Sequence, residues 1–397
     1  MELDLKRADH VVPDYSLTGD LLSFSRCELQ YRYYNGSALP PSRPVQLWYG
    51  EFIHGMMEAA YRLWDASGGM LVFPWPFTPI GDAGPREPPE DGLAPNDIRM
   101  MAWPIEQTLA QEGKQARSRR ARLAAYNRAE RAINMLGPHL FPLISAAEQR
   151  VLGTRPLAAI DGMEPRSSRY ALRGVIDVLG DVLPDPAANN PILDAIGAAV
   201  PGLAGEFEII VDYKGARRPR CAGQRPDQHW LLGEWQVQTY AWLRERQPDA
   251  HPVRAGILIY VNELSPSSSD VGIMQREIRN RETDIIPAAG TPDYYQVQGW
   301  APGTQAQLSD SFKLSRALRV IPVTEESKAE ATTRFDGLVS QIERNVALEA
   351  ERGSIGQAWR ATCDDRNTCS ACDFLSFCPH PAQGADPEAP VGDDEFA

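Results

Sequence analysis

Long apolar runs are missing from this sequence: no stretch approaches the length that spans a bilayer. The first residues, MELDLKRADH, also lack the apolar core of a signal peptide and the pattern of a transit peptide. These absences predict a cytoplasmic protein without membrane contact. The G-x-x-x-x-G-K-[ST] loop of nucleotide-driven motors is missing too, so no helicase motif is present and any unwinding of nucleic acid needs a partner protein.

Basic residues are outnumbered, with 40 Lys and Arg against 53 Asp and Glu and a net charge of −13. This balance argues against a protein that coats nucleic acid through its overall charge, although it is compatible with a local basic groove. One local reversal runs from Lys114 to Arg131, where Glu130 is the one acid among many basic side chains. That stretch fits a phosphate-contacting surface and the solvated face of a long helix equally well.

Cysteine is scarce, with six among 397 residues. In a reducing compartment such cysteines are poor candidates for a disulfide framework, and clustered spacing indicates metal or cluster ligation instead. Three of them, Cys369, Cys372 and Cys378, lie in the stretch TCSACDFLSFCPH near the C-terminus. A soft-metal site normally needs four protein ligands, so a fourth has to come from elsewhere in the chain.

Helix and strand patterns fill most of the chain, which is 43% hydrophobic and 23% charged and suits one large or two ordinary globular domains. Helical spacing is found in SLTGDLLSFSRCELQYRYYNG, YGEFIHGMMEAAYRLWDAS, residues 105–136, QHWLLGEWQVQTYAWLRER and residues 325–351. Strand patterns are found in EQRVLGTRPLAAI, RYALRGVIDVLGD, FEIIVDYKGARRP and RAGILIYVNEL, with a turn joining the first two. Pro- and Gly-rich composition predicts irregular insertions at 68–97 and 184–206, and residues 383–397 are expected to be a disordered acidic tail.

Charged residues that are suited to catalysis or metal binding concentrate in GVIDV and VDYKG. Because side chains alternate along a strand, Asp212 and Lys214 should project to one side and Tyr213 to the other. Asp177 adds a second carboxylate beside Asp212 if the two strands pair. Two close carboxylates repel, and a hard cation such as Mg²⁺ or Mn²⁺ relieves that repulsion. The alternative is that the Asp-x-Lys pattern is only a solvated salt bridge.

The order of several weak signals in this chain resembles the PD-(D/E)XK nuclease superfamily. The signals are His54, Glu148, Asp177 in GVID, Asp212 and Lys214 in VDYK, and Gln236 and Tyr240 in QVQTY. More narrowly, the chain is similar to the RecB-like branch, which includes the nuclease domains of RecB and AddB and the CRISPR-associated RecB-like exonucleases. The resemblance spans most of the chain.

This resemblance implies a restriction-endonuclease-like core with a mixed central sheet flanked by helices, in a single domain over residues 1–382. It implies metal-dependent hydrolysis of DNA, with single-stranded ends as the expected substrate, in DNA processing, repair or defence. The implied metal ligands are His54, Asp177, Asp212 and Tyr213, and Lys214 and Glu148 complete the catalytic set. Gln236 and Tyr240, four residues apart on one helix face, are expected beside the site and in contact with DNA.

A subset of the RecB-like branch carries an iron-sulfur cluster, held by one cysteine before the nuclease core and a C-x-x-C-x5-C group after it. The resemblance therefore implies a [4Fe-4S] cluster on Cys27, Cys369, Cys372 and Cys378, which joins the helical N- and C-terminal parts of the chain. Zinc on the same four cysteines is the alternative metal. Cys363 lies six residues before Cys369 and is a possible substitute ligand.

Arginines directly after the Asp-x-Lys strand, namely Arg217, Arg218 and Arg220, are predicted to contact the phosphates that flank the scissile bond. A second hypothesis comes from another functional class: a DNA-binding iron-sulfur scaffold in which nuclease activity is weak or lost. Retention of Asp177, Asp212 and Lys214 together favours the enzyme over the scaffold.

Overall fold

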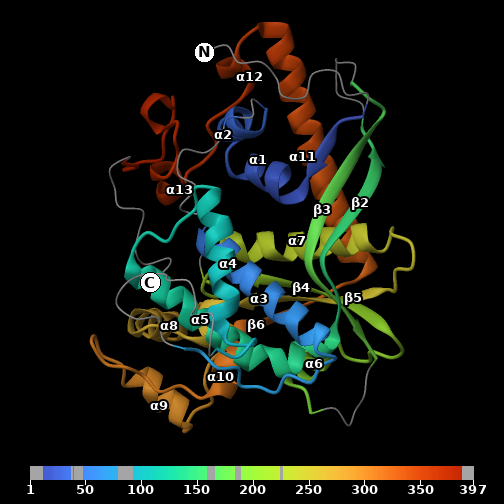
Figure 1. Ribbon diagram of the computed structural model, residues 1–397. Helices are drawn as coiled ribbons and strands as arrows, with labels where there is room; N and C mark the ends of the chain where they lie inside the picture. Colours follow the sequence, from blue (N-terminus) through green and yellow to red (C-terminus); the bar gives the residue numbers. More distant parts are fainter. Residues whose placement is uncertain are drawn as a thin grey trace.

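The computed structural model describes residues 12–36, 39, 48–78, 93–158, 166–183, 189–223 and 227–386. Within these residues the chain forms a mixed, open sheet of six strands with helices on both faces (Figure 1). The predicted α/β class, with a mixed central sheet flanked by helices, is confirmed. The strands are β1 (Asp14–Ser16), β2 (Ile144–Pro156), β3 (Arg169–Val182), β4 (Phe207–Lys214), β5 (Val253–Tyr260) and β6 (Leu318–Pro322).

Strand β3 organises the sheet because it pairs with three other strands. Antiparallel β2 runs along one edge, as predicted from the sequence. The opposite edge carries parallel β1 at residues 171–173 and antiparallel β4 at residues 178–182. Between them, at residues 174–177, no strand of the described chain pairs with this edge. The order continues through β5, parallel to β4, and β6, antiparallel to β5.

Two hydrophobic cores lie on the two faces of the sheet. Strand β4 reads FEIIVDYK, a nearly continuous apolar run, because it is buried on both faces. Ile209 and Val211 point into one core and Ile210 into the other, as the alternation of side chains along a strand requires. The alternation continues to the end of β4. Tyr213 points to the first face, and Asp212 and Lys214 point to the second.

Within the described residues, the main helices on the two faces of the sheet form two groups. The first group is α3 (Trp48–Ala66), α4 (Ile98–Gln111), α5 (Arg119–Leu140) and α6 (Pro191–Ala199). The second group is α1 (Ser23–Arg26), α2 (Glu28–Tyr31), α7 (Gln228–Arg244), α11 (Glu325–Arg352) and α12 (Ile355–Ala358). A smaller core joins α8 (Ser268–Asn280), α9 (Pro292–Gln298) and α10 (Asp310–Ala317), and α13 (Arg366–Ser370) follows near the end of the described chain.

Some local predictions need correction. Residues 191–199 of the predicted irregular insertion 184–206 form α6, because Ile192 and Ile196 are four apart and both are buried. The predicted helix 105–136 is two helices, since the chain turns at Gly113 with φ +77° and restarts where Ser118 caps α5. The N-terminal aromatic helix is also interrupted, at Cys27, whose backbone is extended with φ −161° and ψ 115°.

The other insertion and the tail lie partly outside the described residues. The described parts of 68–97, residues 68–78 and 93–97, contain no helix or strand, in agreement with the prediction. The described start of the predicted tail is hydrogen-bonded to the preceding chain, since the Asp386 amide donates to the Ser370 hydroxyl at 3.0 Å. Residues 387–397 are outside the described part of the chain. No helix in the described part is long and apolar enough to cross a bilayer.

Candidate metal centre and active site

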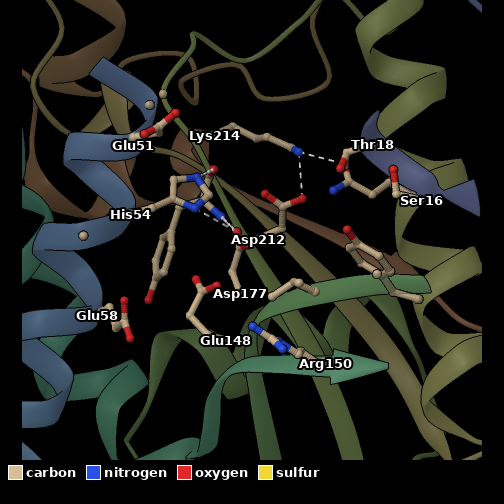
Figure 2. A pocket seen from close by; sticks show the side chains of 18 of the residues that line it. Ser16, Thr18, Glu51, His54, Glu58, Glu148, Arg150, Asp177, Asp212 and Lys214 are labelled. Atoms are coloured by element: carbon tan, nitrogen blue, oxygen red, sulfur yellow. Dashed lines mark hydrogen bonds and ion pairs between the residues drawn. The ribbon is translucent and has the colours of Figure 1, made fainter. Parts of the chain in front are cut away.

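A cleft of about 1600 Å³ opens over the middle of β3 and the C-terminal end of β4 and is bordered by α3, α4 and α7. His54 enters it from α3, Asp177 from β3 and Asp212 from β4 (Figure 2). One possible ligand atom from each of these three side chains lies within 4.8 Å of the other two. In the described residues this is the one group of three or more His, Cys, Asp or Glu side chains that meets that distance.

The predicted meeting of Asp177 and Asp212 is therefore confirmed. The insertion between the two strands does not prevent their pairing, which is in register at Val178↔Val211. Residues 174–177 are the part of the β3 edge that neither β1 nor β4 covers, so the Asp177 side chain is accessible from the cleft.

Two hydrogen bonds of the main chain of Tyr213 orient the histidine and the first aspartate. The Tyr213 carbonyl oxygen lies 2.7 Å from Nε2 of His54 and can only accept, so Nε2 carries a proton. The Tyr213 amide donates to Oδ2 of Asp177 at 3.3 Å. In the neutral imidazole, Nδ1 then holds a lone pair and faces the same Oδ2 at 3.3 Å. Two opposed acceptors at that distance require a proton or a cation between them.

Asp212 and Lys214 do share one side of β4, as predicted. The Lys214 ammonium donates to Oδ2 of Asp212 at 2.7 Å and to Oε1 of Gln236 at 2.8 Å. The Asp212 side chain is 5% exposed, whereas Lys214 is 28% exposed and reaches the cleft. Gln236 thus lies beside the site, where the sequence placed it.

Tyr240 lines the same cleft, one turn along α7 from Gln236, and packs against β3 at Gly174. A Cβ at Gly174 would lie 2.4 Å from Cε1 of Tyr240, so a glycine is needed for the ring to approach the strand. Burial, followed by the charges of Asp212 and Asp177, raises the pKa of the Tyr240 hydroxyl. Tyr240 is therefore a neutral donor at ordinary pH.

Glu148 also lines the cleft, on β2 beside Asp177 (Figure 2). Its φ of +53° is a left-handed conformation that is costly for a residue with a side chain, and such strain is concentrated at functional sites. Burial and then the neighbouring Glu58 raise the pKa of the Glu148 carboxyl. Glu148, a predicted site residue, thus lies with the acids of the cleft.

Electrostatics separate the roles of the acids and the lysine. Burial and the charge of Asp212 raise the pKa of Asp177 from 3.8 to about 7. Burial alone would lower the pKa of Lys214, but the charge and hydrogen bond of Asp212 raise it by more. Lys214 is consequently a fixed cation, and Asp177 is the carboxylate that another positive charge would stabilise most.

Tyr213 contributes its main chain and not its side chain to the site. Its ring lies on the opposite side of β4, in the core under α3, and burial and then Asp177 raise the pKa of its hydroxyl. Its carbonyl oxygen already accepts from His54 at 2.7 Å. The Tyr213 main chain thus positions His54 and Asp177, and a metal contact by Tyr213 stays a prediction.

The predicted phosphate contacts of the three arginines after β4 are only partly compatible with the structure. Arg218 is 3% exposed, and its guanidinium binds Asp284 and the carbonyls of Arg316 and Leu318, so a phosphate contact by Arg218 is wrong. Arg217 pairs with Asp270 at 3.1 Å and with Glu277 at 3.3 Å. Arg220 is exposed.

The basic stretch from Lys114 to Arg131 is largely engaged within the protein. Lys114 pairs with Glu51 and Glu112, Arg122 with Glu106, Arg128 with Asp270 and Arg131 with Asp310. Arg128 is also 3% exposed. These ion pairs favour the interpretation of this stretch as a structural helix face.

Five cysteines line one small cavity of about 30 Å³ between the two ends of the chain: Cys27, Cys363, Cys369, Cys372 and Cys378. In Figure 1 the α1–α2 segment and the α13 segment lie together at this point, and the Leu29 amide donates to the Arg360 carbonyl at 2.9 Å. Among the described cysteines, no three sulfur atoms all lie within 4.8 Å of one another. Burial is the main cause that raises the pKa of the Cys363 thiol to about 12, and the charge of Cys369 and its hydrogen bond with Cys363 add to it.

Glu51, Glu58 and Arg150 are among the charged cleft residues that the sequence interpretation missed. Glu51, His54 and Glu58 are spaced three and four apart, which places them on one face of α3, toward the cleft (Figure 2). That spacing was available in the sequence. Arg150 reaches the cleft from β2, two residues after Glu148.

Comparison with protein-family models and with curated proteins gave no match to this sequence.

Proposed function

We propose that this protein is a divalent-cation-dependent nuclease that hydrolyses DNA phosphodiester bonds, with a restriction-endonuclease-like core of the RecB-like type. The observation that carries the proposal is the combination of His54, Asp177 and Asp212 within 4.8 Å of one another with Lys214 held at 2.7 Å from Asp212. A hard cation and a fixed ammonium beside one cleft suit phosphoryl chemistry.

The donor set fits Mg²⁺ or Mn²⁺. Asp177 and Asp212 offer carboxylate oxygens, which such cations prefer, and His54 offers Nδ1, because Nε2 is occupied by the Tyr213 carbonyl. The raised pKa of Asp177 supports this assignment, since a cation would remove the repulsion that raises it. When bound, such a cation lowers the pKa of water, polarises a phosphoryl oxygen and stabilises the departing alkoxide.

The remaining residues orient and stabilise the substrate. Lys214 supplies positive charge beside the scissile phosphate, in a position fixed by Asp212 and Gln236. Tyr240 keeps its proton and donates toward the substrate, and the Tyr213 main chain holds His54 in one tautomer. Glu148, whose pKa burial and Glu58 raise, is suited to take up a proton more readily than an ordinary glutamate.

Cleavage of labelled single-stranded DNA in the presence of Mn²⁺ tests this proposal. Asp212→Asn and Lys214→Ala should each reduce the rate by roughly 10²–10³-fold. Asp181→Asn is the matched control, because Asp181 is an exposed acid on β3 outside the cleft. Equal rates in the wild type and all three variants would exclude this site as the catalyst and leave the DNA-binding scaffold.

The cysteine cavity completes the proposal. Cys27, Cys369, Cys372 and Cys378 hold a [4Fe-4S] cluster that ties the two ends of the chain together, supported by the gathering of these thiols at one cavity. Anaerobically purified protein should be brown and contain iron and sulfide, and Cys27→Ser should lose both. Cys363→Ser, in the same cavity, should keep them. A colourless protein that contains zinc would contradict this assignment.

A further inference from the structure

A second cavity, of about 710 Å³, adjoins the candidate active site. It meets the first cleft at Lys214 and Gln236, which line both. Its size lies in the range of roughly 300–1000 Å³ that encloses small ligands. A substrate strand that places a phosphate at Lys214 can therefore extend directly into it.

Among the cations that line this cavity, three exposed arginines come from three separate elements: Arg26 at the end of α1, Arg220 after β4 and Arg276 on α8. All three are exposed, and in the described chain none of them forms an ion pair with another side chain. Arg217 and Arg218 lie behind them and are paired with acids, so they shape the wall and are not available to a ligand.

The acids of the cavity offset part of this charge. Glu277 pairs with Arg217 and Arg316, and Asp227, which caps α7, interacts electrostatically with Arg220. Asp227 and Glu282 are thus the acids that remain, against three exposed arginines. The cavity is therefore a locally positive surface on a protein whose net charge is −13.

The walls between these charges are apolar. Leu232 on α7, Ile273 on α8 and the ring of Tyr260 line them. Gly233 also lines the cavity, and a Cβ there would lie 2.5 Å from Cδ1 of the buried Leu258. Cations at the rim and apolar surface between them match the phosphates and unpaired base faces of a single strand. Paired bases offer no such faces.

We propose that this second cavity binds the single-stranded DNA segment on one side of the scissile phosphate, through Arg220 and Arg276. This inference rests on the proposed nuclease function, because it takes Lys214 as the position of the scissile phosphate. The helix that carries Arg276 begins at Ser268, more than fifty residues after Lys214, so the site is built by the fold.

The test uses the full-length protein with both arginines changed, Arg220→Gln and Arg276→Gln. Arg279→Gln is the matched control, because Arg279 is exposed on the same helix but does not line the cavity. Binding of fluorescein-labelled oligothymidylate is measured by anisotropy in EDTA over a range of salt concentrations. Each lost phosphate contact reduces the slope of log affinity against log salt by roughly 0.7, so the double variant should lose about 1.4.

At 0.1 M salt, the double variant should therefore bind the single strand roughly tenfold more weakly than the wild type, or weaker still. In the cleavage assay with Mn²⁺, the double variant should show a correspondingly raised KM and a nearly unchanged kcat. The Arg279→Gln protein should match the wild type in both assays. A blunt duplex of equal length should bind the wild type and the double variant with the same affinity.

The outcomes separate the two proposals. Unchanged single-strand affinity and salt slope in the double variant would overturn the cavity proposal while the cleavage assay still reports on nuclease activity. Equal losses for the single strand and the blunt duplex would also overturn it. If the double variant loses single-strand affinity but the wild type does not cleave DNA, the cavity proposal is retained and the nuclease proposal is overturned.

Discussion

Replacement of Asp177 by Asn should stabilise the protein in the absence of divalent cations. In the folded chain, burial and Asp212 raise the Asp177 pKa from 3.8 to about 7, so the ionised carboxylate is unfavourable there. Each pKa unit corresponds to about 1.4 kcal/mol, which gives a ceiling of ~4 kcal/mol. The side chain is 20% exposed, and water weakens the repulsion, so the expected gain is about 2 kcal/mol. Asn keeps an oxygen for the Tyr213 amide.

The pH dependence has a definite sign. The unfolded carboxyl ionises near pH 3.8 and the folded one near pH 7, so the folded state holds the proton between these values. Below about pH 4 the two proteins should be equally stable. The wild type then loses stability relative to Asp177→Asn as the pH rises to about 7, and the difference is constant above that pH.

Urea unfolding in EDTA, at several pH values from about 5 to about 8, measures this difference. The exposed control Asp181→Asn should stay within about 0.5 kcal/mol of the wild type throughout. Addition of Mn²⁺ should stabilise the wild type and have much less effect on Asp177→Asn. An Asp177→Asn protein no more stable than the control at pH 8, or a difference that ignores pH, would refute the argument.

Three further predictions concern the lysine, the strand–helix contact and the cysteine cavity. Lys214→Met keeps the apolar stem and removes the charge, so DNA cleavage should fall by roughly 10²–10³-fold while Mn²⁺ affinity measured by calorimetry is retained; parallel loss of both would contradict the separation of roles. Gly174→Ala puts a methyl group 2.4 Å from the Tyr240 ring; we expect a loss of about 1–3 kcal/mol in urea unfolding, and an unchanged midpoint would show that the ring moves freely. Cys369→Ser should lower the urea midpoint and expose both ends of the chain to limited proteolysis, whereas Cys221→Ser, outside the cavity, should do neither; equal behaviour of the two variants would argue against a joint between the ends.

Several features of the site were predictable because they depend on short-range periodicity. The alternation of side chains in VDYK predicted that Asp212 and Lys214 share one side, and their 2.7 Å contact confirms it. The spacing of Gln236 and Tyr240 predicted a common helix face, and both line the cleft. The β2–β3 pairing followed from two adjacent strand patterns.

Other features depend on distant parts of the chain and were not predictable in this way. Arg218 looked like a surface cation, but its carboxylate partner, Asp284, is 66 residues away and draws it into the interior. The free stretch of the β3 edge exists because β1, from the N-terminus, and β4 stop on either side of it. The left-handed backbone of Glu148 likewise has no local signal, since glutamate has no preference for it.

Anomalous diffraction from crystals grown with Mn²⁺ tests the central claim most directly. The account predicts a Mn²⁺ peak within coordination distance of the His54 imidazole and of the Asp177 and Asp212 carboxylates, and its loss in Asp177→Asn crystals. Wild-type crystals with no peak among these three side chains, at a Mn²⁺ concentration that supports DNA cleavage, would contradict it.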